Sequence, residues 1–359
     1  MVRVLAIGEL AIMTTPTTMQ MERSGRRYVL DRRLGCGGMA EVFLAHAVGP
    51  ERAPDPVAIK RLRPGLAGHA ELAGRFAFEA RIMSSLAHPN VVTVQDFDHD
   101  AAGLPCLVME LVDGPSLAEL MATARLPRSL CVHLAIEVLR GLDHAHRTPI
   151  ADCVEGVVHR DVSPHNVLIS WQGAVKLGDF GLAKACTASA SVALVGKPSY
   201  MSPEQTTAEP IDGRSDLFAV GVMLWEMLCG TQLFSGRTTY ETLARVLFSP
   251  IPSPSEQHDV PEQLAAITMK LLARDRDDRY DTAQAAIEEL IACDDHEPGA
   301  RELLVELLET RFTERARRAV PMSPQATQQS RLRRVWRWPR LGGAAFVAAI
   351  VAALGFSVT

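Results

Sequence analysis

Three polar side chains in the middle of the chain have types that can accept a proton and hold a divalent cation. Asp161 and Asn166 lie in the run HRDVSPHN at 159–166, and Asp179 begins the run DFG at 179–181. An aspartate can act as a general base, while an asparagine and a second aspartate offer the hard oxygen atoms that Mg²⁺ prefers beside phosphates. The order and spacing of the three residues favour a site over ordinary solvated loop residues.

A glycine-rich run near the N-terminus could hold the phosphates. Residues 35–42 read GCGGMAEV, and the next apolar run, VAIK at 57–60, ends in Lys60. A glycine-rich backbone can approach a polyphosphate closely, and a lysine on the neighbouring strand can neutralise its oxygens. Taken singly, the glycines also fit a tight hairpin turn and Lys60 fits a solvated strand end, so the prediction rests on the combination.

Dense strand and helix patterns from Tyr28 to about Cys293 must position these groups. Residues 127–147 place apolar side chains four residues apart, which predicts an amphipathic helix with one buried stripe. The run at 216–229 is apolar on nearly every side but too short to cross a bilayer, so it predicts a helix at the centre of a large lobe. We expect Ser215 or Asp216 to cap its N-terminus.

Together these motifs resemble the signature of the protein kinase family, over residues 28–293. The runs GKPSYMSPEQ at 196–205 and RYDTAQAAIEEL at 279–290 look like the bacterial-type, eukaryotic-like serine/threonine branch of that family. The resemblance implies an α+β, bilobal protein-kinase-like fold, with a small β-rich N-lobe and a larger, mainly helical C-lobe. It also implies that ATP and Mg²⁺ bind between the lobes and that the γ-phosphoryl group is transferred to hydroxyl groups of protein substrates.

The resemblance assigns roles in catalysis to five of these side chains. By that match, Lys60 would pair with the α- and β-phosphates, and Glu79, in the helix-like stretch 75–86, would hold Lys60 in an ion pair. Asp161 would accept the proton of the substrate hydroxyl, and Asn166 and Asp179 would be the Mg²⁺ ligands. An ordinary glutamate on a helix surface remains the alternative for Glu79.

The resemblance also implies a nucleotide site. The run LVMELVDG at 107–114 looks like the hinge between the lobes, where the backbone of Glu110 and Val112 would bind adenine and Met109 would guard the back pocket. Backbone contacts have no side-chain signature, so an ordinary strand end remains the alternative. The other residues expected to line the nucleotide are Leu34, Gly35, Cys36, Gly37, Gly38, Met39, Ala40, Glu41, Val42, Ala58 and Lys60.

A second ion pair is expected away from the nucleotide. The run Ser202-Pro203-Glu204 looks like the motif that closes the activation segment, and Arg279 looks like its buried partner, although an exposed arginine also fits. Phosphorylation within the segment would order it by pairing with Arg160, unless the segment is merely flexible. The candidate acceptors are Thr187, Ser189 and Ser191.

Two departures from the family pattern are related to each other. Ser163 stands where serine/threonine kinases usually carry a lysine beside the γ-phosphate, and Lys197 stands where they usually carry a threonine. In the family these positions lie close together, so the amine and the hydroxyl would have changed places, which makes Lys197 a candidate catalytic residue. Two independent losses in a weaker enzyme are the alternative. Ala40 replaces the third glycine of the loop, where a small residue is tolerated.

Two other functions fit parts of the sequence. A catalytically weak pseudokinase could act as a membrane-tethered scaffold, but the complete set of catalytic residues argues against it. A small-molecule kinase is disfavoured by the motif at 202–204 and by the activation segment. Pro164 disfavours a tyrosine-specific enzyme, whereas Ser163 weakens the assignment to serine and threonine.

The composition is typical of a folded protein with reduced thiols. The 37 Lys and Arg nearly balance the 42 Asp and Glu, and the net charge of −5 argues against nucleic acid as a partner. Apolar residues at 47% and charged residues at 22% exclude global disorder. The seven cysteines are scattered and form no CxxC pair, so neither a disulfide framework nor a zinc site is expected.

The segments around the kinase-like region complete the expected organisation. Residues 1–27 would form an N-terminal extension, of which 1–20 have no role in the fold, and 294–318 would form a helical extension. A linker and a basic juxtamembrane segment at 319–340 precede 341–359, which has no charge and as a helix would span ~28 Å. This predicts a single-pass transmembrane helix in the cell membrane, with the kinase domain cytoplasmic. A helix packed on the domain or a basic surface-bound tail is the alternative.

Overall fold

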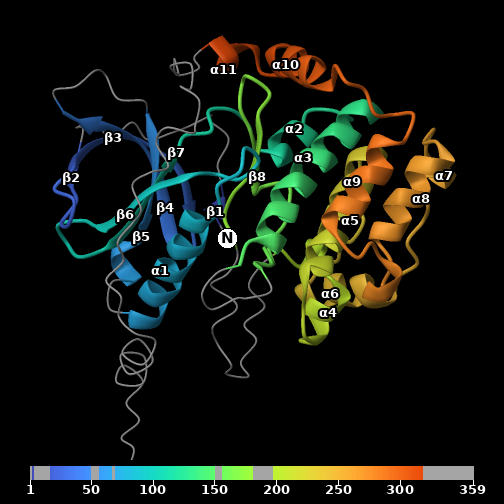
Figure 1. Ribbon diagram of the computed structural model, residues 1–359, viewed down its shortest axis with the longest axis horizontal. Helices are drawn as coiled ribbons and strands as arrows, with labels where there is room; N and C mark the ends of the chain where they lie inside the picture. Colours follow the sequence, from blue (N-terminus) through green and yellow to red (C-terminus); the bar gives the residue numbers. More distant parts are fainter. Residues whose placement is uncertain are drawn as a thin grey trace, which may run out of the picture.

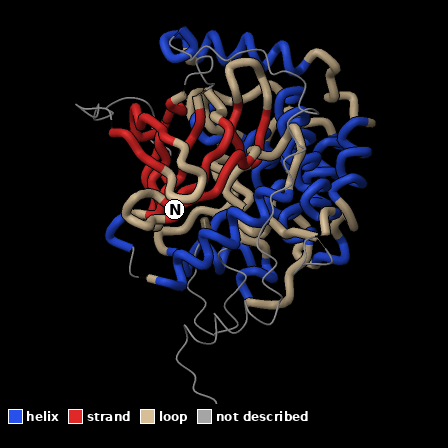
Figure 2. The backbone as a smooth tube through the Cα atoms, turned by 60° about the vertical axis from the view of Figure 1, so that its left-hand side comes forward, coloured by secondary structure: helices blue, strands red, loops and turns tan. Residues whose placement is uncertain are grey.

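Strands form one lobe and helices form most of the other in the computed structural model (Figure 1). The structure describes residues 2–3, 17–49, 56–66, 69–149, 156–180 and 197–317. In Figure 2 the strands gather in one region and most of the helices lie in another. The α+β, bilobal fold predicted from the sequence is confirmed.

The N-lobe is an antiparallel sheet with the strand order β1–β3–β4–β5–β7–β6, and β2 pairs with β3 beside this path. Val42 lies opposite Lys60, and Ala58 lies opposite Met109, so the glycine-rich loop, the lysine strand and the hinge strand are neighbours. The strands are β1 (Val2–Arg3), β2 (Thr17–Gln20), β3 (Arg27–Gly37), β4 (Ala40–Val48), β5 (Val57–Leu62), β6 (Val94–His99) and β7 (Pro105–Glu110).

Strand β2 belongs to this sheet, although we expected residues 1–20 to have no role in the fold. Met19 lies opposite Tyr28 in the pairing of β2 with β3. The side chains of Met19 and Met21 are buried with Tyr28 and Leu30 in a cluster on one face of the sheet. The expectation is wrong for 17–20 because threonines and a glutamine hide a strand whose burial rests on Met19 and the adjacent Met21. It is also wrong for 2–3, which pair with Gly37 and Cys36 of β3.

Helix α1 (Ala70–Ser85) belongs to the core on the other face of the sheet. Phe76, Ala80 and Met83 recur every three or four residues and are all buried there. The helix begins five residues before the predicted stretch 75–86. Glu79 lies next to this apolar stripe and is itself buried, so its charge requires a partner.

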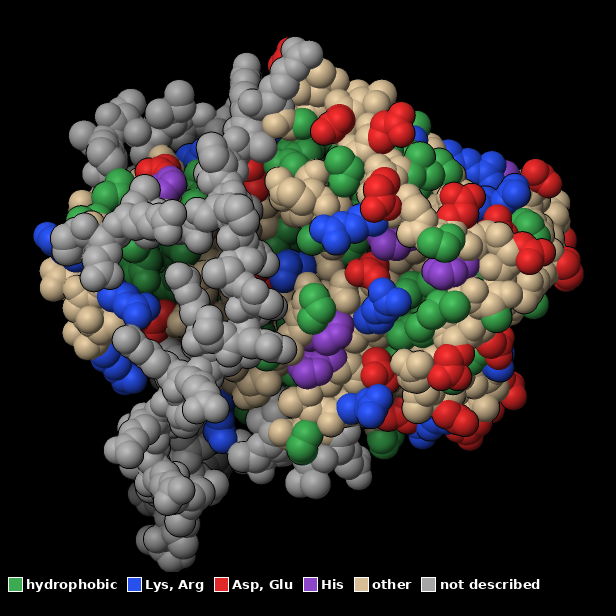
Figure 3. Space-filling view, turned by 45° about the horizontal axis from the view of Figure 1, so that its top comes forward, with side chains coloured by type: hydrophobic (Ala, Val, Ile, Leu, Met, Phe, Trp, Pro, Cys, Tyr) green, Lys and Arg blue, Asp and Glu red, His purple; other side chains and the backbone are tan. Residues whose placement is uncertain are grey.

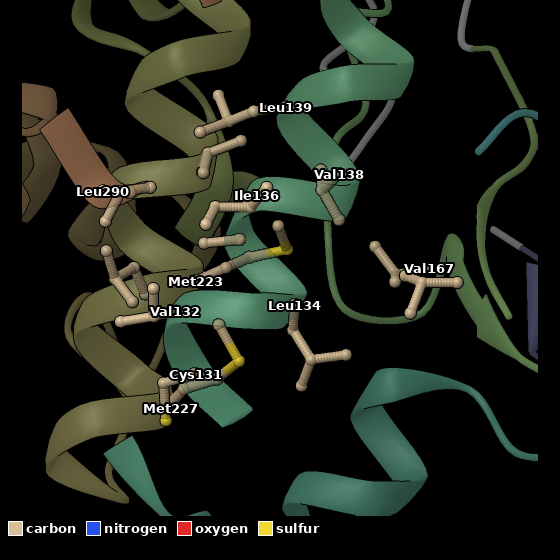
Figure 4. Close-up of a cluster of buried hydrophobic side chains, with 14 of the residues drawn as sticks. Cys131, Val132, Leu134, Ile136, Val138, Leu139, Val167, Met223, Met227 and Leu290 are labelled. Atoms are coloured by element: carbon tan, nitrogen blue, oxygen red, sulfur yellow. The ribbon is translucent and has the colours of Figure 1, made fainter. Parts of the chain in front are cut away.

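Helices α3 (Arg128–Arg147) and α5 (Gly213–Cys229) form the centre of the C-lobe. Figure 4 shows Leu139 of α3, Met223 of α5 and Leu290 of α9 (Ala283–Ile291) within one apolar cluster. Every residue of α5 from 215 to 229 is buried, as its apolar sequence on all sides predicts. Both helices predicted from the sequence are confirmed.

The N-terminus of α5 differs in detail from the prediction. Asp212, rather than Ser215 or Asp216, is the capping residue, and its side chain accepts the N–H of Arg214 at 2.8 Å. Burial raises the pKa of Asp212, but the hydrogen bonds and charge of Arg214 outweigh this and hold it below its ordinary value. Ser215 and Asp216 lie one turn inside the helix, where their oxygens bind other parts of the C-lobe.

The remaining elements surround this centre, and acidic and basic side chains are interspersed over the C-lobe face in Figure 3. They are α2 (Leu117–Met121), β8 (Val167–Ile169), β9 (Val175–Leu177), α4 (Pro203–Thr207), α6 (Thr239–Phe248), α7 (Pro254–Gln257), α8 (Glu262–Leu271), α10 (Ala300–Arg311) and α11 (Thr313–Arg317). The 3₁₀ helices within the described ranges are η1 (Pro64–Leu66), η3 (Pro198–Tyr200) and η4 (Arg276–Asp278).

The structure tests the predictions about the membrane helix and the thiols only in part. Among the described residues, no helix has the length and apolarity needed to cross a bilayer. The linker and the predicted transmembrane helix at 319–359 lie outside the described residues. Five described cysteines are free thiols, and Cys153 and Cys186 fall outside the described ranges.

The cap of α5 gives a test of stability. Asp212→Ala should lower the free energy of unfolding by about 1 kcal/mol, because the Arg214 N–H loses its acceptor. Asp212→Asn should lower it less, because the amide oxygen still caps the helix. Chemical denaturation of both variants measures the difference. Equal losses would show that the ion pair of Asp212 with Arg214, rather than the cap, provides the stability.

Candidate active site

Lys60 lies between two carboxylates that come from different lobes. Its Nζ is 2.6 Å from Glu79 Oε1 on α1 and 2.9 Å from Asp179 Oδ1, which follows β9. Burial alone would lower the pKa of Lys60, but Asp179 and Glu79 raise it above its ordinary value. Burial likewise opposes ionisation of Asp179, yet the Lys60 ammonium holds the pKa of that carboxyl low. The predicted ion pair of Lys60 with Glu79 is therefore present, and it extends to Asp179.

The catalytic loop brings Asp161 and Asn166 together. The Asn166 amide nitrogen donates to the Asp161 carbonyl at 2.8 Å and to its Oδ2 at 3.2 Å. These bonds fix one carboxylate oxygen of Asp161, and they use the nitrogen of Asn166 rather than its amide oxygen. Asp161 can therefore act as an oriented base, while Asn166 keeps an oxygen for a cation.

A buried carboxylate on α5 holds the backbone just before Asp161. Asp216 accepts the N–H groups of His159 and Arg160, each at 2.8 Å. Arg160 has φ 68° and Asp179 has φ 52°, a left-handed conformation that costs energy in non-glycine residues and is often found at functional sites. Sequence reasoning gave Asp216 only a possible capping role, because nothing in a sequence shows which backbone a carboxylate will meet.

The Asp179-Phe180-Gly181 run begins beside the buried His159 ring. The His159 and Phe180 ring centroids are 4.4 Å apart, and His159 Nε2 is 3.1 Å from the Gly178 carbonyl. Burial lowers the pKa of His159, so the ring is held neutral. This packing fixes the direction in which the chain reaches Asp179.

The glycine-rich loop is the turn between β3 and β4. Gly35 lies opposite Val42 and Cys36 lies opposite Glu41, with Gly38 and Met39 at the turn. In the described part of the chain, nothing lies within 4 Å of the position that a Cβ on Gly38 would occupy, while β1 pairs with the adjacent Cys36 and Gly37. The Glu41 carboxylate is 3.1 Å from Arg33 and 3.5 Å from Arg61. The glycine-rich run thus forms the β3–β4 turn, with Gly37 completing β3 and Ala40 opening β4.

Apolar side chains from both lobes meet at the expected adenine site. Leu34, Val42, Ala58, Met109, Val112 and Leu168 belong to one cluster, in which Leu34, Val42, Val112 and Leu168 are only partly buried. Five of them were predicted, whereas Leu168 was missed. The sequence feature that could have identified Leu168 is its position two residues after Asn166, in strand β8. Partly buried apolar side chains of this kind can enclose a flat base.

Glu110 is held at the hinge from both sides. Its N–H donates to the Thr93 carbonyl at 2.9 Å, so Glu110 can offer a base its carbonyl but not its N–H. Its carboxylate accepts the Thr93 N–H at 2.7 Å and pairs with Lys176 Nζ of β9 at 2.8 Å. The hinge is therefore tied to the C-lobe by a buried ion pair that the sequence did not predict.

Lys197 and Ser163 lie next to each other, as the proposed exchange requires. Lys197 Nζ donates to Ser163 Oγ at 3.3 Å. Burial lowers the pKa of Lys197 to about 8, while Asp161 and Asp179 act in the opposite direction. Burial, followed by the charge of Lys197, lowers the pKa of the neighbouring His165 to about 4. At pH 7 the site therefore holds the Lys197 ammonium beside a neutral imidazole.

The predicted ion pair behind the activation segment is present. Arg279 donates to both Glu204 oxygens, at 2.7 and 2.9 Å, and Ser215 donates to the same carboxylate at 2.6 Å. All three residues are buried, so the pair is well shielded from water. Gln205, next to Glu204, donates to the Arg160 carbonyl at 3.0 Å. The candidate phosphorylation sites Thr187, Ser189 and Ser191 lie outside the described residues.

The donor set suits a magnesium ion bound together with phosphates. Asn166 and Asp179 each keep an oxygen beyond the contacts that fix them. In the described part of the chain, no three His, Cys, Asp or Glu residues form a metal-binding group. An ion at Asn166 and Asp179 would thus take the rest of its ligands from phosphate and water, as Mg²⁺ commonly does.

Known proteins are similar to this chain over most of its length. A model of the protein kinase domain matches residues 28–291. The tyrosine-protein kinase MasK of Myxococcus xanthus is 37% identical over 81% of this chain and 47% of its own, and the serine/threonine-protein kinase PknB of Mycobacterium leprae is 36% identical over 80% and 45%. The chain spans about half the length of these curated relatives.

A solved structure agrees with the sequence match. The kinase domain of PknI from Mycobacterium tuberculosis has a TM-score of 0.56 and 28% identity, covering 74% of this chain and 95% of that domain. The matched region contains the lysine, the acidic residues and the hinge described above. The chain therefore belongs to the protein kinase family, in its bacterial, eukaryotic-like branch.

Proposed function

We propose that the chain is an ATP-dependent serine/threonine protein kinase. The observation that carries the proposal is the contact of Lys60 with both Glu79 and Asp179, next to an Asp161 that Asn166 orients. A pseudokinase that serves only as a scaffold requires none of these contacts. The relatives support the reaction class, since those cited above are named protein kinases.

Each residue of the site would have its own role in the reaction, set by its position. Lys60 would hold the α- and β-phosphates, and Asn166 and Asp179 would hold Mg²⁺, which neutralises charge on the phosphate oxygens when it is bound with ATP. The Gly38 turn would cover the phosphates with its backbone, while the hinge carbonyl of Glu110 orients the base. Asp161 would accept the proton of the attacking hydroxyl, because its carboxylate is already fixed.

The catalytic base gives the first kinetic test. Asp161→Asn should lower phosphoryl transfer by about 10²- to 10⁴-fold, because the amide cannot accept the hydroxyl proton. The dissociation constant for ATP should change little, because Asp161 is not assigned a contact with the nucleotide. Transfer of labelled phosphate and calorimetric ATP binding measure the two quantities. An equal loss of ATP binding would contradict the assignment.

The acceptor residue is proposed from the catalytic loop. Pro164 favours serine and threonine, whereas one relative is named a tyrosine-protein kinase and others are named serine/threonine-protein kinases. Incubation of the purified protein with ATP and Mg²⁺, followed by phosphosite mapping, distinguishes the two. Phosphate on serine or threonine supports the proposal, and phosphate confined to tyrosine contradicts it.

We further propose that Lys197 supplies the cation that catalytic loops of this family usually carry. The support is its contact with Ser163 in the catalytic loop and its electrostatic interaction with Asp161 and Asp179. Charge that develops on the transferred phosphoryl group needs a cationic partner, and the hydroxyl of Ser163 cannot supply one. Lys197 is the capping residue just before η3, so this cation would be provided by the activation segment rather than by the loop that carries Asp161.

The exchange predicts a specific kinetic pattern. Lys197→Ala should lower kcat by about 10²-fold, as the removal of one charge-stabilising donor typically does, with little change in ATP affinity. Ser163→Lys combined with Lys197→Thr should restore much of the rate by rebuilding the usual arrangement, so the two sites should be non-additive. Near-wild-type activity in Lys197→Ala would identify Lys197 as an ordinary loop residue.

The same proposal predicts a pH dependence. The pKa of Lys197 is about 8, so the ammonium is lost from the free enzyme as the pH rises through that value. Since kcat/KM reports the free enzyme, kcat/KM for ATP should fall above about pH 8 in the wild type. The Lys197→Ala variant serves as the control and should lack this fall. An identical fall in both proteins would assign the titration to another group.

We also propose that a C-terminal helix anchors the kinase to the cell membrane, with the catalytic domain in the cytoplasm. The support is the uncharged segment 341–359 and the basic, tryptophan-containing segment before it. Ile350→Arg should move the protein from the membrane fraction to the soluble fraction, because an arginine near the centre of a spanning helix costs about 2.5–3.5 kcal/mol. Thr313→Arg, at an exposed position of α11, is the control and should stay with the membrane. A wild-type protein found entirely in the soluble fraction would contradict the anchor.

A further inference from the structure

Helix α2 connects the hinge to the catalytic loop. The Ala118 N–H donates to the Pro164 carbonyl at 3.0 Å, and the Ile169 N–H donates to the Pro115 carbonyl at 2.9 Å. Pro164 lies between Asp161 and Asn166 in the sequence. A displacement of α2 would therefore move the loop that orients the catalytic carboxylate.

The helix is short and depends on its N-terminal cap. It has only five residues, Leu117–Met121, and isolated helices of this length are not stable in water. The Ser116 hydroxyl accepts the Glu119 N–H at 3.2 Å, and Glu119 Oε2 accepts the Ser116 N–H at 2.9 Å. This reciprocal capping box uses one of the two oxygens of the Glu119 carboxylate.

The other oxygen of Glu119 binds the C-terminal extension, α10 and α11. Arg315 Nη1 of α11 is 3.0 Å from Glu119 Oε1, and the two side chains are only 20% and 15% exposed. The Arg315 guanidinium lies over the Phe312 ring, 5.2 Å from its centroid, and Phe312 packs edge-on against Trp171 between β8 and β9. These aromatic contacts limit where the guanidinium can go, so the ion pair is held in one geometry.

A second arginine of the extension binds the other end of α2. Arg311 donates to the carbonyls of Ala124 and Arg125 at 3.0 and 2.9 Å, and to Thr123 Oγ1 at 3.0 Å. The extension therefore contacts both α2 itself and the chain just after it, and α10 and α11 run along the same edge of the molecule (Figure 1). Both arginines lie beyond residue 291, where the family match ends.

We propose that Arg315 is a positioning residue for the catalytic loop. It holds Glu119 in its capping geometry, Glu119 holds α2, and α2 holds Pro164 and thereby Asp161. The inference rests on the proposed kinase activity, because its main readout is the rate of phosphoryl transfer. It makes catalysis depend on the extension at 300–317, so any event that displaces these helices would slow the reaction.

The test compares variants of the full 359-residue chain. Arg315→Ala should lower kcat about fivefold, the size expected for a half-buried ion pair, with KM for ATP nearly unchanged. Glu119→Gln keeps a side chain that can complete the capping box but removes the ion pair, so it should lower kcat similarly. The double variant should be no slower than either single variant, and Arg315→Lys should recover part of the rate.

A matched control separates positioning from stability. Arg128 on α3 binds Asp295 at 2.9 Å, also between distant parts of the chain, and no described contact joins it to α2. Arg128→Ala should lower the melting temperature without changing kcat. An Arg315→Ala variant with unchanged kcat, or with a loss equal to that of Arg128→Ala, would overturn the inference.

Hydrogen exchange gives a readout that does not need activity. The amides of Ala118 and Asn166, which donate to Pro164 and Ser163, should exchange faster in Arg315→Ala and at the wild-type rate in Arg128→Ala. Unchanged exchange at both amides would overturn the inference. If the wild-type protein transfers no phosphate, the proposed function fails, and the exchange rates alone decide whether Arg315 positions the loop.

Discussion

The active site depends on one buried carboxylate, that of Asp216. It accepts two backbone N–H groups immediately before Asp161, and His146 Nε2 lies 2.7 Å away. Burial of an unpaired carboxylate is very costly, but His146 and the backbone donors outweigh the effect of burial and hold the pKa of Asp216 below its ordinary value. The strained backbone at Arg160 can persist because this carboxylate fixes it from below. The first turn of α5 therefore lies against the catalytic loop.

A second constraint connects the two lobes. Lys60 and Glu79 belong to the N-lobe and Asp179 to the C-lobe. These three side chains therefore meet only when α1 and the two lobes are correctly placed relative to one another. The ion pair of Glu110 with Lys176 fixes the lobes a second time, at the hinge. Breaking a buried pair leaves an uncompensated charge, which costs about 3–5 kcal/mol. These two sets of ion pairs therefore favour a single relative position of the lobes over a range of more open positions.

The sequence predicted the fold and the main site residues because their signals are local. Lys60, Asp161, Asn166 and Asp179 lie in short runs with fixed spacing, and the nearly all-apolar run at 216–229 predicts a buried helix. The parts that were missed depend on contacts between distant residues. Asp216 was expected to cap its own helix, but it binds a loop 56 residues earlier, at Arg160. Strand β2, Leu168 and the pair of Glu110 with Lys176 likewise become visible only when separate strands are brought together.

Local sequence patterns also fail to reveal the contact between the C-terminal extension and α2. Arg315 and Glu119 are 196 residues apart, and each looks like an ordinary surface charge on an amphipathic helix. What distinguishes them is that Glu119 already uses one oxygen to cap a helix too short to stand alone. An ion pair on the remaining oxygen can therefore act on the cap, on α2 and on the catalytic loop together.

The proposed active site then takes its groups from four separate parts of the chain. Lys60 comes from the sheet, Asp161 from a loop held by α5, Asp179 from the segment after β9, and Lys197 from the start of η3. A cation on the catalytic loop would be present whether or not the activation segment is in place. With Lys197 as that cation, the stretch from Lys197 to Glu204, which Arg279 holds at its end, also completes the charge of the site. In this arrangement, the placement of Lys197 beside Ser163 and the assembly of the proposed phosphoryl-transfer centre become the same event.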